Sequence, residues 1–375
     1  MVLLLWLACS DDKPSTGDTA GAPDSSGDTT DSAGTDSADT ADDTDSTPVE
    51  TNPPDSGDSD TGEPDTGDTA DSDSAGDSGD TGTPPEPVPV RFVVLGDGGE
   101  GNDTQYAVAD AMLAVCATKT DADPGCEFAL YLGDNFYDDG VAAVDDEQFQ
   151  TKFELPYADL TFPFYVVLGN HDYGSLSLLG YKADYEIAYT AYSSKWTLPD
   201  HSYSFVVENV LFLGLDTNQI MLESLWGDSG QGDWLDNEIA AAGADWNITF
   251  GHHPYRSNGA HGNAGEYEGY DWLPIANGAT VEDFMDAHFC GQVDLYFAGH
   301  DHNRQWLEPY CEVELVVSGA AAKTTDLEDR GNTTWFEDDS TAGFMWVEIR
   351  GDTMIGEFYD EAGALSYRGE VTRRP

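Results

Sequence analysis

Five short loops that combine glycine with polar, metal-binding side chains constrain this chain more than any other feature. Their sequences are Gly96-Asp97-Gly98-Gly99, Gly133-Asp134-Asn135-Phe136-Tyr137, Gly169-Asn170-His171-Asp172, Gly251-His252-His253-Pro254 and Gly299-His300-Asp301-His302. Four of the five follow an apolar run that is typical of a buried strand. Because ligands collect at the carboxyl ends of strands in an open α/β sheet, we expect these loops to meet at one place.

The composition changes near residue 90. Residues 10–89 consist of Asp, Ser, Thr, Gly, Ala and Pro with almost no large apolar side chains, and they carry 23 acidic residues against one basic residue, Lys13. Such a tract cannot bury enough apolar surface to offset its conformational entropy. We therefore expect residues 10–89 to be a disordered acidic linker and residues 90–375 to form the folded domain.

The folded part is also strongly acidic, with 50 acidic and 13 basic residues. This balance argues against nucleic-acid binding, which depends on clusters of basic residues. An anionic substrate would be repelled at long range. A phosphate ligand therefore requires positive charge at the site itself, such as that of bound metal ions.

The N-terminal residues are expected to direct the chain out of the cytosol. Residues 1–8 are apolar but too few to span a bilayer, and they resemble the end of an export signal. Leu7-Ala8-Cys9 resembles the cleavage box of bacterial lipoproteins, which predicts residues 1–9 as signal and a lipid on Cys9 that attaches the chain to a membrane. The alternative is a secreted protein without a lipid.

The other four cysteines predict two disulfides, since their number is even and the chain is expected to be exported. Three pairings are open from the sequence. We expect Cys116–Cys126 and Cys290–Cys311, because these pairs enclose the shortest loops.

Hydrophobic patterns predict an α/β fold. The expected strands are 90–95, 128–132, 164–168, 204–207, 210–215, 247–250, 293–297, 313–317, 343–349 and 353–359, and the expected helices are 104–118, 181–189, 231–242 and 281–288. Asn102 or Asp103 is the expected cap of the first helix. This order indicates parallel βαβ units early and antiparallel strands late. Two mixed β-sheets packed face to face, with helices outside, accommodate both.

Seven side chains in the five loops carry oxygen or nitrogen atoms that bind metals. They are Asp97, Asp134, Tyr137, Asn170, His252, His300 and His302. Asp97 is expected to bind one ion, and Asp134 is placed to bridge two. Two ions about 3.5–4 Å apart clamp a phosphoryl group, so this set predicts a hydrolase of phosphate esters.

The types of the other ligands bear on the identity of the metals. Tyr137 lies three residues after the bridging carboxylate, so a turn directs its phenol toward the first ion, whereas Asn170 offers a neutral oxygen to the second ion. His300 and His302 alternate across Asp301 and are expected to share one face of an extended backbone. Carboxylate, imidazole and amide ligands suit Zn, Mn or Fe, and a phenolate favours ferric iron.

The motifs together resemble those of the calcineurin-like metallophosphoesterases. Residues 133–137 and 299–303 are similar to the purple acid phosphatases, especially the small tartrate-resistant type, and the resemblance covers most of residues 90–320. Residues 90–375 would then be a metallophosphoesterase domain. The region beyond residue 320 departs from the family pattern.

The resemblance implies an acid phosphatase with a dinuclear centre. A ferric ion would be held by Asp97, Asp134, Tyr137 and His302, and a divalent Fe, Zn or Mn ion by Asp134, Asn170, His252 and His300. A metal-bound hydroxide would attack the phosphorus of a small phosphate monoester. A ferric phenolate would also absorb visible light.

The resemblance assigns roles to further residues near the metals. His171 matches a family histidine that contacts the substrate, and His261 falls where the small phosphatases place a second one; either would protonate the leaving group. Asp172 is expected to orient His171, since carboxylates commonly orient such rings. His253 receives no role. His261 has an alternative interpretation as an exposed loop histidine.

Three other functions compete with this hypothesis. Gly96, Gly98 and Gly101, with Asp121 further along, satisfy a dinucleotide-binding fingerprint, but Asp97 inside that loop would repel a pyrophosphate. A binding module that kept the fold would show degenerate ligands, and none is missing. A phosphoesterase with two divalent ions acting on phosphodiesters or nucleotides is the nearest rival, and Tyr137 argues against it.

Overall fold

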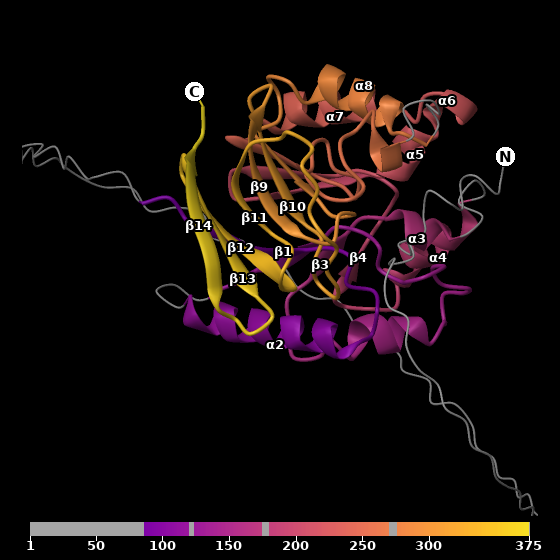
Figure 1. The fold of residues 1–375 in the computed structure, drawn as a ribbon, viewed down its shortest axis with the longest axis vertical. Coiled ribbons are helices and arrows are strands. Elements are labelled where there is room, and N and C mark those ends of the chain that lie inside the picture. The colour runs from indigo at the N-terminus through magenta and orange to yellow at the C-terminus, as the bar shows by residue number, and fades with distance from the viewer. Residues whose placement is uncertain (1–85, 120–123, 175–179, 270–275, 375) are drawn as a thin grey trace, which may run out of the picture. The chain divides into compact units, whose positions relative to one another are not determined.

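Two seven-stranded β-sheets packed face to face form the centre of the computed structural model, which describes residues 86–119, 124–174, 180–269 and 276–374 (Figure 1). The first sheet has the order β14 (Leu365–Thr372), β13 (Thr353–Asp360), β12 (Gly343–Arg350), β1 (Val90–Leu95), β2 (Phe128–Tyr131), β3 (Phe164–Val166) and β4 (Trp196–Thr197). The second has the order β11 (Thr334–Asp338), β9 (Arg304–Tyr310), β10 (Val313–Ser318), β8 (Leu295–Ala298), β7 (Trp246–Phe250), β6 (Val210–Gly214) and β5 (Tyr203–Val207). The expected α/β class with two mixed sheets is confirmed.

Strand direction changes from parallel to antiparallel within each sheet. β1, β2, β3 and β4 are parallel neighbours, whereas β12, β13 and β14 form an antiparallel meander beside β1. In the second sheet, β6, β7, β8 and β10 are parallel neighbours. β5 pairs antiparallel with β6, β9 with β10, and β11 with β9. The expected order of parallel units first and antiparallel strands later holds for β1 to β4 and for β12 to β14, whereas β10, expected to be antiparallel, also pairs in parallel with β8. The sheet topology places the carboxyl ends of β1, β2, β3, β7 and β8 where their loops can meet.

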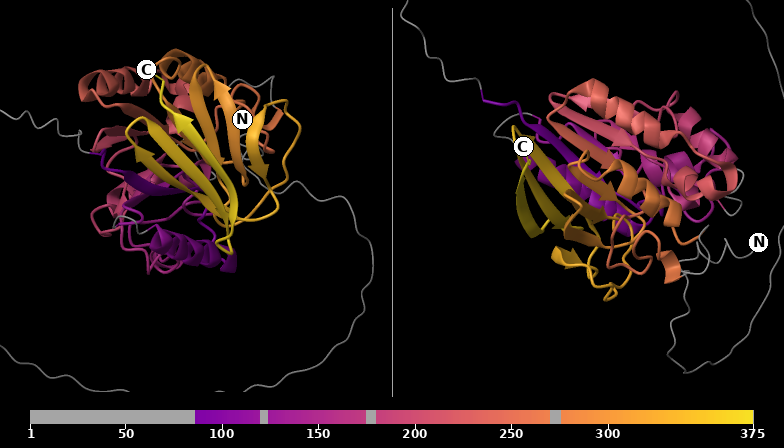
Figure 2. Two further views of the ribbon diagram at one scale, coloured as in Figure 1. Left: turned by 90° about the vertical axis from the view of Figure 1, so that its left-hand side faces the viewer. Right: turned by 90° about the horizontal axis from the view of Figure 1, so that it is seen from above.

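Helices cover the outer faces of the two sheets, as Figures 1 and 2 show. They are α2 (Asp103–Thr118), α3 (Asn170–Tyr173), α4 (Tyr181–Tyr189), α5 (Thr217–Met221), α6 (Glu223–Trp226), α7 (Gln231–Ala242) and α8 (Ala279–His288), with a π-helix η1 (Gln150–Glu154) and a 3-10 turn η3 (Tyr267–Gly269). α2 contacts β12 and β13, while α7 contacts β6 and packs with α8. The side chain of Asn102 accepts a hydrogen bond from the amide of Gln105, which confirms Asn102 as the N-cap of α2.

Aromatic side chains fill the space between the sheets. The Phe92 ring of β1 stacks on Phe128 with centroids 5.0 Å apart, and its edge meets Phe212 at 5.3 Å and Phe297 at 6.0 Å. Phe212 and Phe297 belong to the second sheet, so these contacts join the two layers. Each such pair contributes about 0.5–1.5 kcal/mol beyond the burial of its area. The rigid core holds the strand ends that carry the loops.

Two disulfides tie the periphery to the core. Cys116 at the end of α2 is bonded to Cys126, and Cys290 after α8 is bonded to Cys311. Both pairings are the expected ones. Across the described part of the chain, none of the helices combines the length and the apolar character needed to cross a membrane. Cys9 and residues 10–85 lie outside the described residues.

Four strands of the structure carry no clear signal in the sequence. β9, β11, β14 and the two-residue β4 were not predicted, and β8 begins at Leu295 rather than at residue 293. β9 contains charged residues and a proline, and β11 and β14 alternate exposed and partly buried positions at the sheet edges. Edge strands such as β11 and β14 are defined by pairing with a neighbour, so their own sequences carry little signal.

Candidate metal centre

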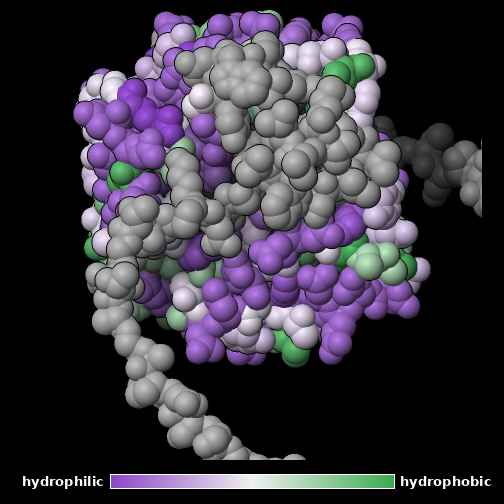
Figure 3. Space-filling model, turned by 45° about the vertical axis from the view of Figure 1, so that its right-hand side comes forward, coloured by the Kyte–Doolittle hydropathy of each residue, from purple (hydrophilic) through white to green (hydrophobic). Residues whose placement is uncertain are grey.

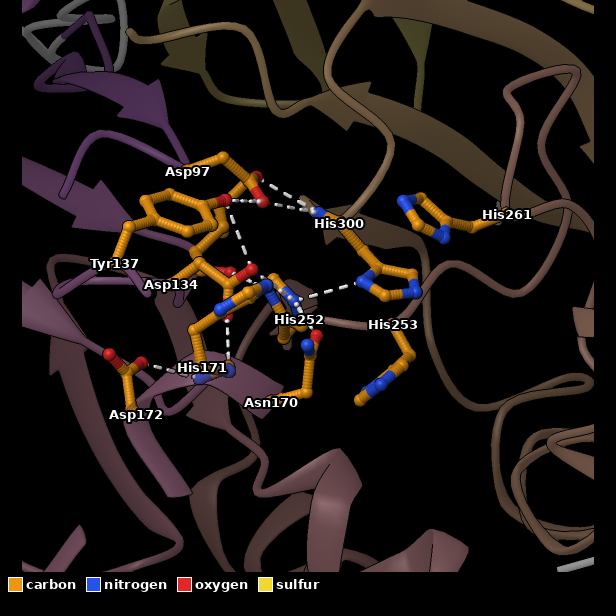
Figure 4. Close-up of polar contacts among 12 residues, drawn as sticks. Asp97, Asp134, Tyr137, Asn170, His171, Asp172, His252, His253, His261 and His300 are labelled. Atoms are coloured by element: carbon orange, nitrogen blue, oxygen red, sulfur yellow. Dashed lines mark hydrogen bonds and ion pairs between the residues drawn. The ribbon is translucent and has the colours of Figure 1, made fainter. Parts of the chain in front are cut away.

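The seven candidate ligands converge at the ends of five strands, as Figure 4 shows for those it labels. Asp97 follows β1, Asp134 and Tyr137 follow β2, Asn170 opens α3 after β3, His252 follows β7, and His300 and His302 follow β8. All seven side chains are buried. Their donor atoms form two groups that share the Asp134 carboxylate.

The first group surrounds the phenol oxygen of Tyr137. This oxygen lies 3.1 Å from Asp97 Oδ1, 3.0 Å from Asp134 Oδ2 and 3.0 Å from His302 Nε2. His302 Nε2 also lies 3.5 Å from Asp97 Oδ1. Neighbouring ligands of an octahedral ion with bonds of about 2.1 Å are about 3.0 Å apart. The four atoms therefore fit the coordination shell of one ion.

The second group surrounds Nε2 of His252. This nitrogen lies 3.0 Å from Asn170 Oδ1, 3.1 Å from His300 Nδ1 and 3.4 Å from Asp134 Oδ2. The distances again match those between ligands of a single ion. Because the same Asp134 oxygen takes part in both groups, it is placed to bridge two ions.

Hydrogen bonds fix the donor atoms in these positions. His252 Nδ1 lies 2.8 Å from the carbonyl oxygen of Leu132, so Nδ1 donates there and Nε2 points into the site. The backbone amide of His171 donates to Asp134 Oδ1 at 2.9 Å, and the backbone amide of His300 donates to Asp97 Oδ2 at 2.9 Å. The site is thus shaped by the protein's own contacts.

Three ligand residues have left-handed backbone conformations. The φ angles are 60° at Asp97, 51° at Asp134 and 70° at His300. Such conformations cost on the order of 1–3 kcal/mol each for residues other than glycine. The expectation that His300 and His302 share one face of an extended backbone is wrong, because the turn at His300 directs the two rings into different groups.

Burial and mutual charges set the protonation of these groups. Burial by itself raises the pKa of the Asp134 carboxyl, but the charges of His252 and His171 more than offset it and hold the pKa well below its usual range. Burial lowers the pKa of His252, yet the Asp134 carboxylate raises it to about 9. Burial and the neighbouring imidazoles lower the pKa of His300. A raised pKa at His252 means that a cation at the second group competes with protons for this ring.

The segment that carries these donor atoms matches a known family. The model of the calcineurin-like phosphoesterases matches residues 90–304, more than half of the chain. This chain belongs to the calcineurin-like phosphoesterase family. The match contains all seven candidate ligands of this phosphoesterase.

The curated relatives of this phosphoesterase extend the likeness beyond the matched segment. Tartrate-resistant acid phosphatase type 5 of Rattus norvegicus is 28% identical over 318 residues, which cover 76% of this chain and 91% of that protein. Purple acid phosphatase 7 of Arabidopsis thaliana is 27% identical over 312 residues, covering 76% of this chain and 87% of the relative.

Two solved structures share the fold of this phosphoesterase. GAP50, the anchor in the inner membrane complex of Plasmodium, aligns with a TM-score of 0.59 at 21% identity and covers 76% of this chain and 90% of its own. Purple acid phosphatase PPD1 of yellow lupin aligns with a TM-score of 0.57 at 15% identity and covers 77% of this chain and 54% of its own. At these identities the likeness concerns the fold alone.

The two histidines expected to contact the substrate lie beside the candidate ligands. The ring of His171 faces that of Tyr137 with centroids 4.5 Å apart, and its Nδ1 lies 2.7 Å from the carbonyl oxygen of Asp138. The ring of His261 lies against His300 with centroids 4.1 Å apart. His261 is 7% exposed, so the alternative of an exposed loop histidine is wrong.

The carboxylate of Asp172 holds the loops rather than the His171 ring. It accepts hydrogen bonds from the amides of Asn135, Phe136 and Gly169 and from the Asn135 side chain. The contact expected between Asp172 and the His171 imidazole is thus replaced by the Asp138 carbonyl. Asp172 fixes His171 only through the backbone of α3.

The loop after β1 forms part of the candidate site, and the dinucleotide hypothesis is left without support. Three backbone hydrogen bonds, Asp97 N to Gly133 O, Gly99 N to Asp134 O and Tyr137 N to Gly99 O, join it to the loop after β2. The Asp97 carboxylate faces His300 and Tyr137. Asp121, the other residue of that fingerprint, lies outside the described residues.

Several residues near the site were missed by sequence reasoning. Asp301 lies between two ligands in the sequence, but its carboxylate points to Ser257 and the His261 amide. Glu268 contacts His261 Nδ1. Lys323 lies with Nζ 3.5 Å above the Tyr137 ring and pairs with Glu100 at 3.0 Å. Only Asp301 carried a sequence signal, its place in the Gly-His-Asp-His motif.

Proposed function

We propose that the protein is an acid phosphatase that hydrolyses small phosphate monoesters at a dinuclear metal centre. The observation that carries the proposal is the position of the Tyr137 phenol, within 3.1 Å of Asp97, Asp134 and His302. A phenol oxygen amid two carboxylates and an imidazole is the donor set for a hard, highly charged cation. The relatives named tartrate-resistant and purple acid phosphatases support the activity.

The donor sets assign different metals to the two positions. Asp97, Asp134, Tyr137 and His302 would hold ferric iron, and Asp134, Asn170, His252 and His300 would hold a divalent iron, zinc or manganese ion. When bound, the two cations supply an activated water and neutralise charge on the phosphoryl oxygens. The acidic surface makes that local positive charge necessary for binding an anionic substrate.

The surrounding residues orient the reaction and move the proton. His171 donates from Nδ1 to the Asp138 carbonyl, and we therefore assign its contact with a substrate oxygen to Nε2. Nδ1 of His261 contacts Glu268, so its role toward the substrate is likewise assigned to Nε2. Either imidazole would protonate the departing alkoxide and so remove the need to release a strongly basic leaving group.

The decisive experiment combines metal analysis with turnover. The purified full-length chain is expected to contain two metal ions including iron, to absorb visible light and to hydrolyse p-nitrophenyl phosphate. Asp97→Asn and His302→Ala should abolish turnover, whereas Asp110→Asn on the exposed side of α2 should not. Full activity in the first two variants with both metals retained would refute the site.

The same preparation separates the rival functions. Two divalent ions, no visible absorption and a preference for bis(p-nitrophenyl) phosphate would establish a phosphodiesterase instead. A non-catalytic binding role, compatible with a fold shared with a protein described as an anchor, would show as bound metal without turnover. Figure 3 shows that hydrophilic residues predominate among the described residues visible on that face.

We further propose that the protein is exported, as a cell-envelope lipoprotein with a lipid on Cys9 or in secreted form. The two disulfides of the folded part support export, because disulfides persist in oxidising compartments. Mass spectrometry of the N-terminus of the native protein tests the lipid. A mature protein with an unprocessed Met1 recovered from the cytosol would contradict export.

A further inference from the structure

The segment that carries His261 is held over the metal site by two carboxylates. The amide of His261 donates to Asp301 Oδ1 at 2.7 Å, and the other oxygen of Asp301 accepts a hydrogen bond from Ser257 Oγ. The imidazole of His261 contacts Glu268 through Nδ1. Asp301 thus fixes the backbone of the segment, whereas Glu268 fixes the ring.

Glu268 is bound to His261 at both its backbone and its side chain. Its amide donates to the His261 carbonyl oxygen at 3.0 Å, and this closes a loop in which the carboxylate meets the ring. Tyr267, which is 1% exposed, anchors the same turn because its amide donates to the Asn277 carbonyl at 3.1 Å. The position of the carboxylate therefore follows from the fold of η3.

The backbone of Glu268 is strained. Its φ and ψ are 58° and 9°, in the left-handed region that glycine adopts most readily. A residue other than glycine in such a conformation costs on the order of 1–3 kcal/mol, and such outliers cluster at functional sites. The turn would be more stable with glycine at this position, so a glutamate there implies a use for its carboxylate.

We infer that Glu268 is a positioning residue that holds the His261 ring in one orientation through Nδ1, with Nε2 directed toward the substrate. The inference rests on the proposed phosphatase function. The group that donates is the His261 imidazolium, which carries a proton on each ring nitrogen: Nδ1–H is donated to Glu268, and Nε2–H passes to the leaving-group oxygen, which leaves a neutral ring protonated at Nδ1. Without the carboxylate the ring is free to rotate about its side-chain torsions, so fewer encounters present Nε2–H correctly.

Glu268→Gly and Glu268→Gln test this role, with Glu266→Gln as the matched control. Glu266 is exposed, lies two residues away and carries the same charge. The glycine variant removes the carboxylate and relieves the left-handed strain, so it is expected to unfold at the same or a higher temperature than the parent. Its kcat should nevertheless fall about 10–100-fold, the usual effect of removing a partner that orients a ligand ring. KM should change little.

Two further measurements show whether the effect passes through His261. The loss in kcat should be larger for an alkyl phosphate than for p-nitrophenyl phosphate, because only the alkoxide leaving group depends strongly on a proton donor. In a His261→Ala background, Glu268→Gly should cause no additional loss. Glu266→Gln should match the parent throughout.

Several results would overturn the inference. One is a Glu268→Gly enzyme that keeps parental kcat on both substrates, and another is a loss that persists in full without His261. The donor atoms of His261, Glu268 and His300 also lie close enough to hold a metal, so a third ion per chain that disappears in Glu268→Gln would assign the group to metal binding. A metal-free parent without turnover would instead refute the proposed function, and this inference with it.

Discussion

Replacing Gly99 with alanine is expected to remove metal from the first group of ligands while leaving the fold intact. Gly99 lies where the loop after β1 crosses the loop after β2. A Cβ atom at this position would lie 2.5 Å from the backbone nitrogen of Phe136 and closer still to the Asn135 carbonyl group. These are backbone atoms, so no side chain can turn away to make room.

The size of the displacement decides which property fails. The loops must separate by about 1 Å for the new Cβ to reach 3.4 Å, where ordinary van der Waals contact begins. Metal sites tolerate errors of about 0.2 Å in their ligand distances. Asp97 lies on one loop and Asp134 and Tyr137 on the other, so one ion cannot retain all three. Overpacking itself costs about 1–3 kcal/mol, less than the 5–15 kcal/mol of a typical domain's stability.

The assay is elemental analysis of the purified variant beside its thermal unfolding. Gly243→Ala is a suitable control, because its φ of +57° strains an alanine by about 1–2 kcal/mol although no atom lies within 4 Å of the new Cβ. Both variants should lose similar stability, but only Gly99→Ala should lose metal. If Gly99→Ala bound two ions with parental affinity, the crossing of these loops would not be what defines the site.

Three other changes test separate parts of the structure. Tyr137→Phe should remove visible absorption while the second position keeps its ion, and an unchanged spectrum would exclude a ferric phenolate. Burial lowers the pKa of His201, but Asp216 raises it, and the folded-state pKa lies above the usual value. The His201–Asp216 pair therefore stabilises the fold at pH values below the unfolded-state pKa of His201. This stabilisation is lost as the pH rises through the folded-state pKa. His201→Gln should therefore reduce the difference in Tm between acidic and alkaline buffer; an unchanged difference would contradict this linkage. The folded part carries 50 acidic and 13 basic residues, which repel an anionic monoester. Raising the salt concentration from about 0.01 M to about 0.15 M screens this repulsion and should therefore raise kcat/KM. A decrease in kcat/KM would show that local positive charge dominates.

Much of the fold was predictable because its signals are local. The helices 181–189 and 231–242 and the hairpin at 204–215 follow hydrophobic periodicity and turn residues, and the structure contains them as α4, α7 and β5–β6. The apolar runs that end in a glycine correctly located the strands that carry the site. Both disulfides followed from loop length alone.

The missed features depend on contacts between distant residues. The direction of the His300 ring follows from a left-handed backbone held by the Asp97 carboxylate, 203 residues earlier in the chain. The Asp172 carboxylate accepts hydrogen bonds from the amides of residues 135–136 rather than from the ring of its neighbour His171, because the fold brings those amides within reach. Lys323 reaches the Tyr137 ring from beyond the segment that matches the family. No local pattern contains these pairings.

The glycines of the five loops explain why the ligands could be recognised at all. Asp97, Asp134 and His300 each directly follow a glycine, and those glycines lie where two loops touch. A Cβ would lie 2.9 Å from the Leu132 side chain at Gly96, 2.7 Å from the Gly169 amide at Gly133 and 2.5 Å from the Asp97 carboxylate at Gly299. Donor atoms about 3 Å apart on different loops require backbones this close. The glycines are therefore a consequence of convergence, and the accidental dinucleotide fingerprint around Gly96 has the same origin.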